Sequence, residues 1–417
     1  MIYGEKPKTF ASREPLITHT GFASGQVAAL CAIQFSMSEE SKIISAATAL
    51  SELMQRPVQT RAVDVRSAGE FAQGSILGFI SAPILTDSER HEVGLCYKEK
   101  GQAAAVELGY QLTRADRDAR VQKWVAALSG AETPIVTCWR GGLRSEIAAD
   151  WIRQAGQPVF RVEGGYKALR QELVKAFESL PEFFVLAGPT GAGKTTLLNE
   201  ISTPKVDLEK LANHRGSAFG GFADSPQPRQ ASFENSVAFK LNELAAGLKA
   251  GRAVLVEDES ANIGSVKLPA QLKEKMSLSP VIKLNVSVEE RARNICEEYV
   301  GRPLREGLAS ERLFEMYDRS LLKIQSKLGG AQTQIIRAQL KDAFSGEAAA
   351  PAAADAASVV VAAANINGPD AHLIWITSLL VNYYDKLYQY SFNKHSRKII
   401  FEGDHQSCKT WIQNQYA

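Results

Sequence analysis

The residues best placed to do chemistry in this chain surround Cys138. Cys138 and Arg144 form a C-x5-R pattern that follows the apolar run 134–137 and precedes a helical pattern. A loop of this length before a helix turns several backbone N–H groups toward one anion, and the same dipoles favour the nucleophilic thiolate. We therefore predict that Cys138 is a nucleophile in a loop that binds a tetrahedral oxyanion. The other predicted members of this loop are Arg140, Gly141, Gly142, Arg144 and Ser145.

A second anion site is predicted 50 residues further on, where 188–195 matches GxxxxGK[ST] between an apolar run and a helical pattern. Backbone N–H groups of such a loop cradle a di- or triphosphate, Lys194 reaches its oxygens, and Thr195 can hold Mg²⁺. The motif identifies neither a nucleotide nor hydrolysis. The predicted diphosphate-binding residues are Gly188, Thr190, Gly191, Gly193, Lys194 and Thr195.

Acidic residues follow the predicted strand 252–256 and form the natural partner of this phosphate loop. Glu257 and Asp258 are the candidates, with Asp258 as the first choice and Mg²⁺ expected between Thr195 and Asp258. A polar strand end without a metal is the alternative. No tightly bound cofactor is predicted.

A polar segment after the phosphate loop contains further candidates for substrate contact, namely Asp207, His214 and Arg215. His214 and Arg215 lie in an Asn-His-Arg-Gly run that suits a loop contacting a phosphate or a base. A structural polar turn explains the same residues equally well.

The elements that must position these loops alternate between strand and helix. Strands are expected at 62–66, 134–138, 158–162, 183–187 and 252–256, and amphipathic helices lie between them. This order predicts an α/β fold with parallel sheets: a first parallel-sheet domain, a second α/β domain built on the phosphate loop, and a helical C-terminal region. The predicted divisions are an extension at 1–55, domains at 56–178 and 181–285, and a mainly helical region at 286–417 with an Ala-rich insertion at 346–365.

Composition narrows the functional classes only slightly. The chain has 417 residues, of which 45% are hydrophobic and 23% charged, and its net charge of +2 is too small to predict nucleic-acid binding. Its five cysteines are scattered without a CxxC pair, which argues against a disulfide framework or a zinc site and favours a reducing compartment. No apolar run approaches the roughly 20 residues of a membrane helix. Met37 is a candidate start of the natural protein.

The segment upstream of Cys138 separates two protein classes that share C-x5-R. Asp64-Val65-Arg66, followed by Glu70 and Gly74, resembles the first signature of rhodanese domains. Phosphotyrosine-type phosphatases usually have His before the cysteine, where this chain has Thr137. The resemblance implies sulfur or selenium transfer in a rhodanese-like domain.

Longer segments resemble the tRNA 2-selenouridine synthase family, in which a rhodanese domain precedes a P-loop domain. The resemblance runs from about residue 55 to the C-terminus, and the combination of segments is highly specific. The similar segments are 93–98 (VGLCYK), 162–170 (VEGGYKALR), 207–220 (DLEKLANHRGSAFG), 231–235 (ASFEN), 256–260 (VEDES) and 297–299 (EEY).

This resemblance implies a two-step reaction at the wobble position of tRNA. The family geranylates 2-thiouridine with geranyl diphosphate and then replaces the geranylated sulfur by selenium from selenophosphate. By resemblance, Lys194 and the P-loop hold geranyl diphosphate, and the Cys138 loop holds selenophosphate. Whether Cys138 carries a perselenide or only organises the anion stays open. The implied partners are the tRNA anticodon arm and a selenophosphate synthase that supplies the donor, in the cytoplasm and away from membranes.

Other functions fit parts of the same pattern. A P-loop kinase or ATPase, or a sulfurtransferase acting on tRNA, would also combine these loops. A C-x5-R phosphatase would use Cys138 alone, and a tRNA-binding scaffold would need neither Cys138 nor Lys194.

Overall fold

The computed structural model describes residues 42–248, 252–345, 370–393 and 397–416. Met37 and the Ala-rich run 346–365 lie outside these described residues, as does most of the predicted extension 1–55. Within the described part, two parallel sheets with flanking helices and a helical C-terminal region confirm the predicted α/β fold. None of the described helices is long and apolar enough to cross a membrane.

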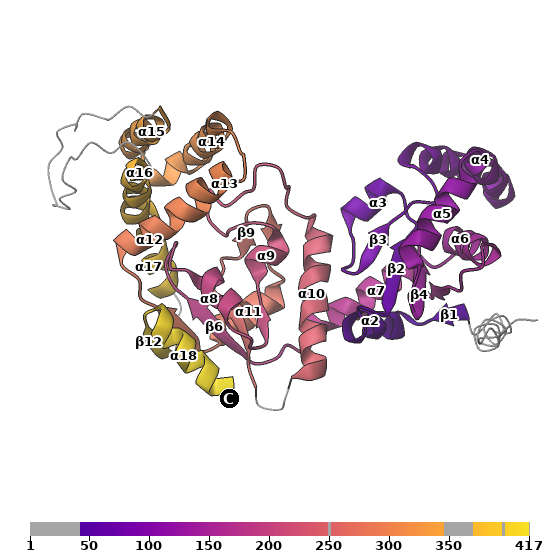
Figure 1. Ribbon diagram of the computed structural model, residues 1–417, viewed down its shortest axis with the longest axis horizontal. Helices are drawn as coiled ribbons and strands as arrows, with labels where there is room; N and C mark the ends of the chain where they lie inside the picture. The colour runs from indigo at the N-terminus through magenta and orange to yellow at the C-terminus, as the bar shows by residue number, and fades with distance from the viewer. Residues whose placement is uncertain (1–41, 249–251, 346–369, 394–396, 417) are drawn as a thin grey trace, which may run out of the picture. The chain divides into compact units, whose positions relative to one another are not determined.

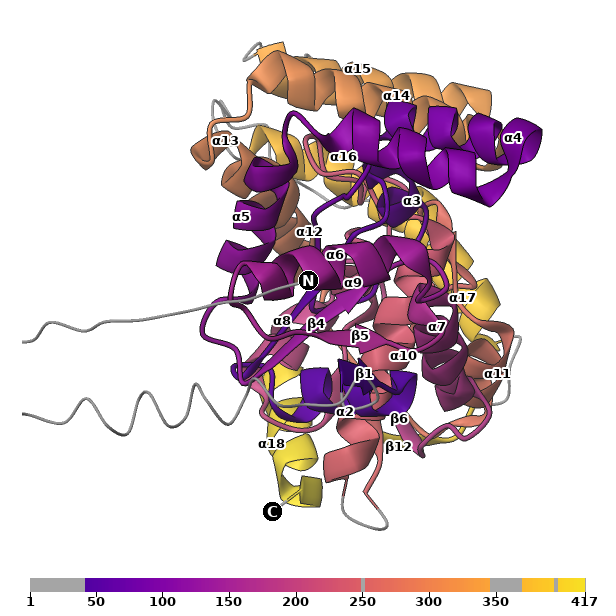
Figure 2. The ribbon, with the colours of Figure 1, turned by 90° about the vertical axis from the view of Figure 1, so that its right-hand side faces the viewer.

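The first sheet has five strands in the order β1-β5-β4-β2-β3. Its central strands, β2 and β4, are buried and pair in parallel, with Ala62 opposite Ile135. Figure 2 shows β4 and β5 side by side, with α6 and α7 next to them. The strand bounds are β1 (Ile43–Ile44), β2 (Thr60–Asp64), β3 (Phe79–Ser81), β4 (Thr133–Thr137) and β5 (Phe160–Val162).

Two helices of the first domain, α3 (Ala68–Gln73) and α4 (Asp87–Thr113), begin at capping boxes. Ser67 and Thr86 each accept a hydrogen bond from the third residue of the following helix, whose Glu side chain accepts one in return. The long helix α4 breaks at Gly101, where φ is 84°. The bounds are α2 (Ala46–Gln55), α3 (Ala68–Gln73), α4 (Asp87–Thr113), α5 (Arg117–Leu128), α6 (Leu143–Gln154), α7 (Gly165–Val174) and the 3-10 turn η2 (Lys175–Phe177).

The second sheet is parallel throughout, in the order β12-β11-β6-β8-β7. Its edge strand β12 comes from the C-terminal region and pairs with β11. Figure 1 shows α18 (His405–Tyr416), in yellow, beside α8 (Lys194–Glu200), with which it shares a hydrophobic cluster. The strands are β6 (Phe183–Ala187), β7 (Lys205–Val206), β8 (Val254–Glu257), β11 (Val281–Leu284) and β12 (Ile399–Gly403), with a separate hairpin of β9 (Asn262–Ile263) and β10 (Val266–Lys267).

Helices cover this sheet and continue into a C-terminal bundle with an aromatic core that includes Tyr299, Tyr317 and Trp375. The helices near the sheet are α8 (Lys194–Glu200), α9 (Leu208–Ala212), α10 (Gln230–Gly247), α11 (Ala270–Leu278) and α18 (His405–Tyr416). The bundle contains α12 (Val288–Ile295), the π-helix η3 (Cys296–Gly301), α13 (Arg302–Arg305), α14 (Ser310–Leu328), α15 (Gly330–Ser345), α16 (Ala371–Leu379), the π-helix η4 (Leu380–Tyr384) and α17 (Asp385–Asn393).

Helices α7 and α10 join the rhodanese-like part to the P-loop part of the chain. Leu169 and Leu173 of α7 share one hydrophobic cluster with Phe233 and Val237 of α10. The amide nitrogen of Asn235, also on α10, donates to the hydroxyl of Tyr166 at 3.2 Å. The two apolar residues of each helix lie four positions apart, so each helix presents one face to the other.

Candidate functional site

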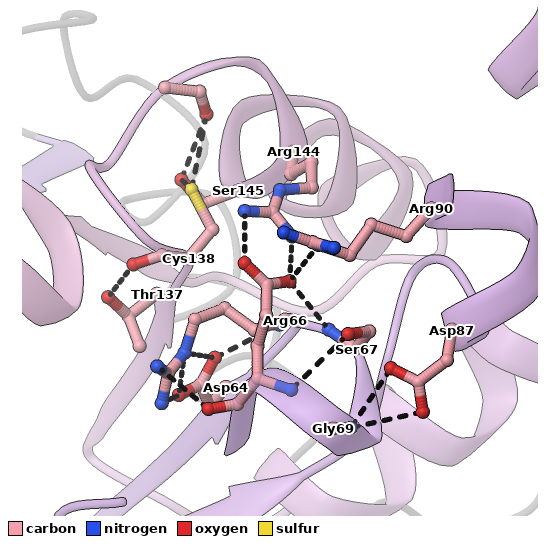
Figure 3. Close-up of polar contacts among 12 residues, drawn as sticks. Asp64, Arg66, Ser67, Gly69, Asp87, Arg90, Thr137, Cys138, Arg144 and Ser145 are labelled. Carbon is pink, nitrogen blue, oxygen red and sulfur yellow. Dashed lines mark hydrogen bonds and ion pairs between the residues drawn. The ribbon is translucent and has the colours of Figure 1, made fainter. Parts of the chain in front are cut away.

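Cys138 follows the carboxyl end of β4 and begins the loop that leads into α6. Its sulfur lies 3.2 Å from the hydroxyl of Ser145, which donates to the carbonyl of Gly142 at 3.0 Å. Figure 3 shows the Cys138 sulfur and Ser145 facing each other at the start of α6. The Cys138 side chain is 3% exposed, so the sulfur lies at the base of the loop. The structure therefore brings together the predicted nucleophile and three predicted loop residues, Gly142, Arg144 and Ser145.

The start of α7 fixes the shape of this loop. The backbone N–H of Tyr166 donates to the carbonyl of Cys138 at 2.8 Å, and that of Lys167 donates to Trp139 at 3.1 Å. Gly165 has φ of 62°, and a Cβ there would lie 2.3 Å from the nitrogen of Gly141 and 2.4 Å from the Cys138 carbonyl. Only glycine fits at this contact, which gives the Gly-Gly pair before Tyr166 a physical role.

Glu70 of α3 positions the arginine of the loop. Its carboxylate lies 2.5 Å from Arg144 and 3.0 Å from Arg90 of α4. Burial alone would raise the pKa of Glu70, but the hydrogen bond and charge of Arg144, with the charge of Arg90, hold that pKa below its usual value. Figure 3 shows the Arg90 and Arg144 side chains converging. Arg140, in contrast, is exposed.

Arg66 of the upstream signature is buried beneath the loop. Its guanidinium pairs with Asp64 at 2.6 Å and lies 3.8 Å from the ring centre of Tyr166. It also donates to the carbonyl of Gly74 at 2.7 Å. The signature Asp64-Val65-Arg66 therefore supports the loop and does not reach the anion site.

The phosphate loop connects β6 to α8 as predicted. Gly191 and Gly193 have φ of 81° and 78°, the left-handed conformation that lets the chain wrap around an anion. The Lys194 ammonium donates to the carbonyl of Gly188 at 3.2 Å, across the mouth of the loop. The Thr195 hydroxyl donates to Glu209 at 2.9 Å.

Helix α12 braces the outer side of the phosphate loop. Arg291 donates to the carbonyl of Thr190 at 3.2 Å, and Asn294 donates to that of Gly191 at 3.0 Å. Asp385 holds the Arg291 guanidinium through two hydrogen bonds of 2.8 Å. These contacts hold two carbonyl groups of the loop against α12.

Three carboxylates lie next to Thr195. Oxygens of Glu209, Glu257 and Glu259 lie within 4.8 Å of one another. Burial, with the charges of neighbouring carboxylates, raises the pKa of all three, that of Glu259 to about 8. Oε2 of Glu257 is buried without a hydrogen-bond partner among the described residues. Carboxylate and hydroxyl oxygens are the ligands that Mg²⁺ prefers, so this donor set fits that ion.

Asp258, the first choice from the sequence, points elsewhere. Its carboxylate pairs with Arg397 at 2.7 Å, just before β12. Glu257 is the last residue of β8, is fully buried, and accepts from the backbone of Glu209 at 2.7 Å. This geometry favours Glu257 over Asp258 as the acidic residue of the phosphate loop.

Two of the three predicted substrate-contact residues, Asp207 and Arg215, have side-chain partners in the structure. Asp207 caps α9 by accepting from the Lys210 backbone at 2.8 Å. Arg215 pairs with Glu298 at 3.2 Å and lies over the rings of Phe222 and Tyr299.

His214 lies beside these residues and is 8% exposed. Burial and the charge of Arg215 lower the pKa of His214, and its Nδ1 has no hydrogen-bond partner among the described residues. Substrate contact by Asp207, His214 and Arg215 stays a prediction.

Sequence reasoning missed the residues that position the two loops. Glu70 was noted only as part of a signature, Glu259 only as the third member of the acidic run that follows the predicted strand, and Glu209 and Arg291 received no role. The available signal was local: Glu209 and Glu259 lie inside segments that also carry predicted site residues.

Comparisons with known proteins match both halves of the chain. The model of the "tRNA 2-selenouridine synthase AAA domain" family matches residues 181–417, and that of the "Rhodanese-like domain" family matches residues 46–172. The chain is 38% identical over 376 residues to the tRNA 2-selenouridine synthase of Cupriavidus pinatubonensis, covering 86% of this chain and 96% of that protein. It is 37% identical over 366 residues to the protein of the same name from Shewanella loihica, covering 85% of this chain and 93% of that protein.

Proposed function

The chain belongs to the tRNA 2-selenouridine synthase family, and from this we propose that it replaces sulfur by selenium at C2 of 2-thiouridine in the tRNA wobble position. The observation that carries the proposal is the pairing of two built anion loops in one chain. One loop presents Cys138 beside an arginine that Glu70 orients, and the other presents Lys194 beside three carboxylates. Two anionic substrates, selenophosphate and geranyl diphosphate, fit two such loops.

The phosphate loop would serve the first step, geranylation. The thiocarbonyl sulfur of the base attacks the allylic carbon of geranyl diphosphate, and diphosphate leaves. Lys194 and the loop N–H groups stabilise the charge that develops on the leaving diphosphate. Thr195, Glu209, Glu257 and Glu259 would hold Mg²⁺, which would neutralise part of the same charge.

The Cys138 loop would serve the second step. Selenium of selenophosphate bonds to C2, the C2–S bond breaks, and geranyl thiol leaves with a proton. Water takes the phosphoryl group, so the S-geranyl base, hydrogen selenophosphate and water give 2-selenouridine, geranyl thiol and phosphate. No atom changes its oxidation state in this sum.

This balance bears on the role of Cys138. A perselenide made from a thiol and selenophosphate would need an oxidant or a reduced phosphorus product, because both reactants carry fully reduced chalcogens. We therefore propose that the loop binds selenophosphate intact, with Arg144 on its oxygens and Cys138 against the reacting atoms. The tRNA anticodon arm and a selenophosphate synthase are the proposed partners, in the cytoplasm.

The test uses the full chain with 2-thiouridine tRNA, geranyl diphosphate and selenophosphate, followed by mass spectrometry of the nucleosides. We expect 2-selenouridine from the unmodified protein. Cys138→Ala should accumulate S-geranyl-2-thiouridine, because only the second step uses this loop. Lys194→Ala should reduce geranylation by about 100-fold or more, a typical loss when a group that stabilises a charged leaving group is removed.

Matched controls separate these roles from general damage. Cys408→Ala removes another buried free cysteine, and Lys210→Ala removes an exposed lysine of α9; both should retain both steps. Normal 2-selenouridine formation by both Cys138→Ala and Lys194→Ala would refute the proposal. ATP turnover independent of Cys138, or hydrolysis of aryl phosphates in place of selenation, would instead support a kinase, an ATPase or a phosphatase.

A further inference from the structure

An apolar cavity of about 470 Å³ lies in the rhodanese-like domain, between α4 and α6. Its wall is made mainly of carbon atoms from aliphatic and aromatic side chains. These side chains include Leu85, Val93, Val106, Ile147 and Trp151. A cavity of this size and character is typical of a site for a small apolar ligand.

The break in α4 builds this cavity. Gly101 adopts φ of 84°, and residues from both arms of the helix, 90–98 and 102–113, line the space. Trp151 of α6 stacks on Trp124 with ring centres 6.2 Å apart, and the Trp124 indole donates to the carbonyl of Ala82 at 2.8 Å. One wall is therefore rigid, and the cavity is a built feature of the domain.

Large apolar side chains remain exposed around the cavity. Tyr97 is 57% exposed, Leu95 and Tyr110 are each 44% exposed, and Leu143 is 41% exposed. Scattered exposed apolar residues are normal, but four around one cavity mark a place where an apolar group binds.

The cavity leads directly to the Cys138 loop. Leu143 and Arg144, the first residues of α6, line it, and so does Arg90 of α4. Arg90 and Arg144 share the carboxylate of Glu70, and Figure 3 shows both guanidinium groups close together. The site therefore combines an apolar space with cations at the cysteine loop, as an apolar chain attached to a polar reacting group requires.

We propose that this cavity holds the hydrocarbon chain on the sulfur that leaves the base in the selenium step. The inference rests on the proposed function, and it places the hydrocarbon chain in the rhodanese-like domain. When selenium bonds to C2 and the C2–S bond breaks, the leaving thiol must lie beside the bound selenium donor. The apolar space next to Arg144 is where an isoprenoid chain on that sulfur is removed from water.

This placement lets the hydrocarbon chain contribute binding energy to the second step. Each methylene group moved from water into an apolar site strengthens binding by about fourfold. The enzyme would therefore distinguish a base that carries a long chain on sulfur from one that carries only a methyl group. Because the same C2–S bond breaks in both bases, a difference in their rates of conversion measures the contribution of the cavity and not that of the chemical step.

Gly94 offers a way to fill the cavity without touching the cysteine loop. It lines the cavity, and a Cβ placed there would have no atom within 4 Å. Gly94→Phe should occupy the space, whereas Gly94→Ala should leave most of it open. Val106→Phe fills it from the other arm of α4. Glu99→Phe places the same ring at an exposed position of the first arm, outside the cavity lining, and is the matched control.

The test gives the full chain selenophosphate and an anticodon-arm RNA that carries either S-geranyl- or S-methyl-2-thiouridine. Single-turnover conversion to 2-selenouridine is followed by mass spectrometry, and RNA binding is followed separately by fluorescence anisotropy. We expect the unmodified protein to convert the geranyl RNA at least about 100-fold more efficiently, in line with burial of several methylenes. Gly94→Phe and Val106→Phe should reduce this preference at least about tenfold and leave the methyl RNA unchanged. Gly94→Ala should reduce the preference less than Gly94→Phe does, and Glu99→Phe, outside the lining, should behave like the unmodified protein.

Equal conversion of both RNAs by the unmodified protein would overturn the inference and leave the proposed function intact. So would equal losses on both RNAs in correctly folded filling variants, checked by circular dichroism. If neither RNA is converted, the proposed function fails, and the anisotropy measurement then decides the cavity by itself. If the unmodified protein binds the geranyl RNA more tightly than the methyl RNA and Gly94→Phe removes this difference, the result supports hydrocarbon binding in the cavity. Equal binding of both RNAs by the unmodified protein would overturn it.

Discussion

Arg144, the last residue of the C-x5-R pattern, lies 2.5 Å from the carboxylate of Glu70, a residue 74 positions earlier in the chain. Glu70 also completes the capping box that starts α3, so its position is fixed by the backbone of that helix. The two parts of the rhodanese-like signature thus meet in one ion pair. The pair holds a long, flexible side chain in place before a substrate anion arrives.

Glu70→Gln should weaken this arrangement without removing any loop residue. The amide keeps one hydrogen-bond acceptor but loses the charge that holds Arg144 and Arg90, so Arg144 becomes free to leave the loop. We expect the selenium step to slow by about 10- to 100-fold, a typical loss for residues that orient a catalytic group. The rate of conversion of S-geranyl-2-thiouridine RNA measures this.

Two comparisons show whether the effect is one of positioning. Glu70→Asp should recover part of the rate, because the charge returns at a shorter reach, and geranylation should be unchanged in both variants. Glu92→Gln removes an exposed carboxylate of the neighbouring helix α4 and should have no effect. Equal selenation rates in Glu70→Gln and the unmodified protein would argue against a positioning role.

Local sequence patterns were sufficient to predict where both candidate loops lie between a strand and a helix. The strand β6 has the predicted bounds, Phe183–Ala187, and β4 ends one residue before Cys138, because short apolar runs bounded by glycine-rich turns identify buried strands. The residues of the C-x5-R and GxxxxGK[ST] patterns themselves determine the backbone conformation of their loops. Their geometry depends on residues close in sequence.

Contacts between distant segments could not be predicted in this way. The strand β12 pairs with β11 although more than 100 residues separate them, and nothing in Ile399–Gly403 specifies that neighbour. Glu257 and Asp258 are adjacent acids at a strand end, and only the register of β8 decides which one faces Thr195. The ion pair between Glu70 and Arg144 is also a contact between distant segments, because it depends on the packing of α3 against the loop.

The choice between Glu257 and Asp258 can be tested directly. Glu257→Gln removes a carboxylate from the group next to Thr195, so geranylation should fall by about 100-fold or more. Asp258→Asn breaks an ion pair with Arg397 outside that group and should reduce geranylation by less than about tenfold. Formation of S-geranyl-2-thiouridine without selenophosphate, measured over a range of Mg²⁺ concentrations, gives both values.

The selenium step provides the internal control for these two variants. When S-geranyl-2-thiouridine RNA is supplied directly, both should form 2-selenouridine at the normal rate, because the Cys138 loop is untouched. A larger geranylation defect in Asp258→Asn than in Glu257→Gln would restore Asp258 as the acidic partner of the phosphate loop.

His372 should make the stability of the C-terminal bundle depend on pH. Burial lowers the pKa of His372 to about 4, and its Nδ1 accepts a hydrogen bond from the Trp375 indole at 3.1 Å. Between about pH 6.5 and 4 the unfolded chain therefore binds a proton that the folded chain refuses, so stability falls as the pH falls through this window.

His372→Gln keeps an acceptor for Trp375 but does not titrate, so the variant should lose less stability on acidification. Between pH 7.5 and 5, we expect its melting temperature to fall by about 2–5 °C less than that of the unmodified protein. Thermal denaturation followed by circular dichroism at both pH values measures the difference. Identical pH dependence of the two proteins would show that His372 does not control this stability.

Gly165→Ala tests the contact between α7 and the cysteine loop. A Cβ at this position would overlap the Gly141 nitrogen and the Cys138 carbonyl, and its φ of 62° is unfavourable for alanine, so the loop must move. We expect a loss of about 2–4 kcal/mol in the free energy of unfolding in urea, and selenation should fall while geranylation persists. Gly94→Ala makes the same change where nothing lies within 4 Å and should instead stabilise α4 by about 0.5–1 kcal/mol. Equal stabilities of the two variants would mean that the loop adapts to the added methyl group, and the close approach of Gly165 would then not determine its shape.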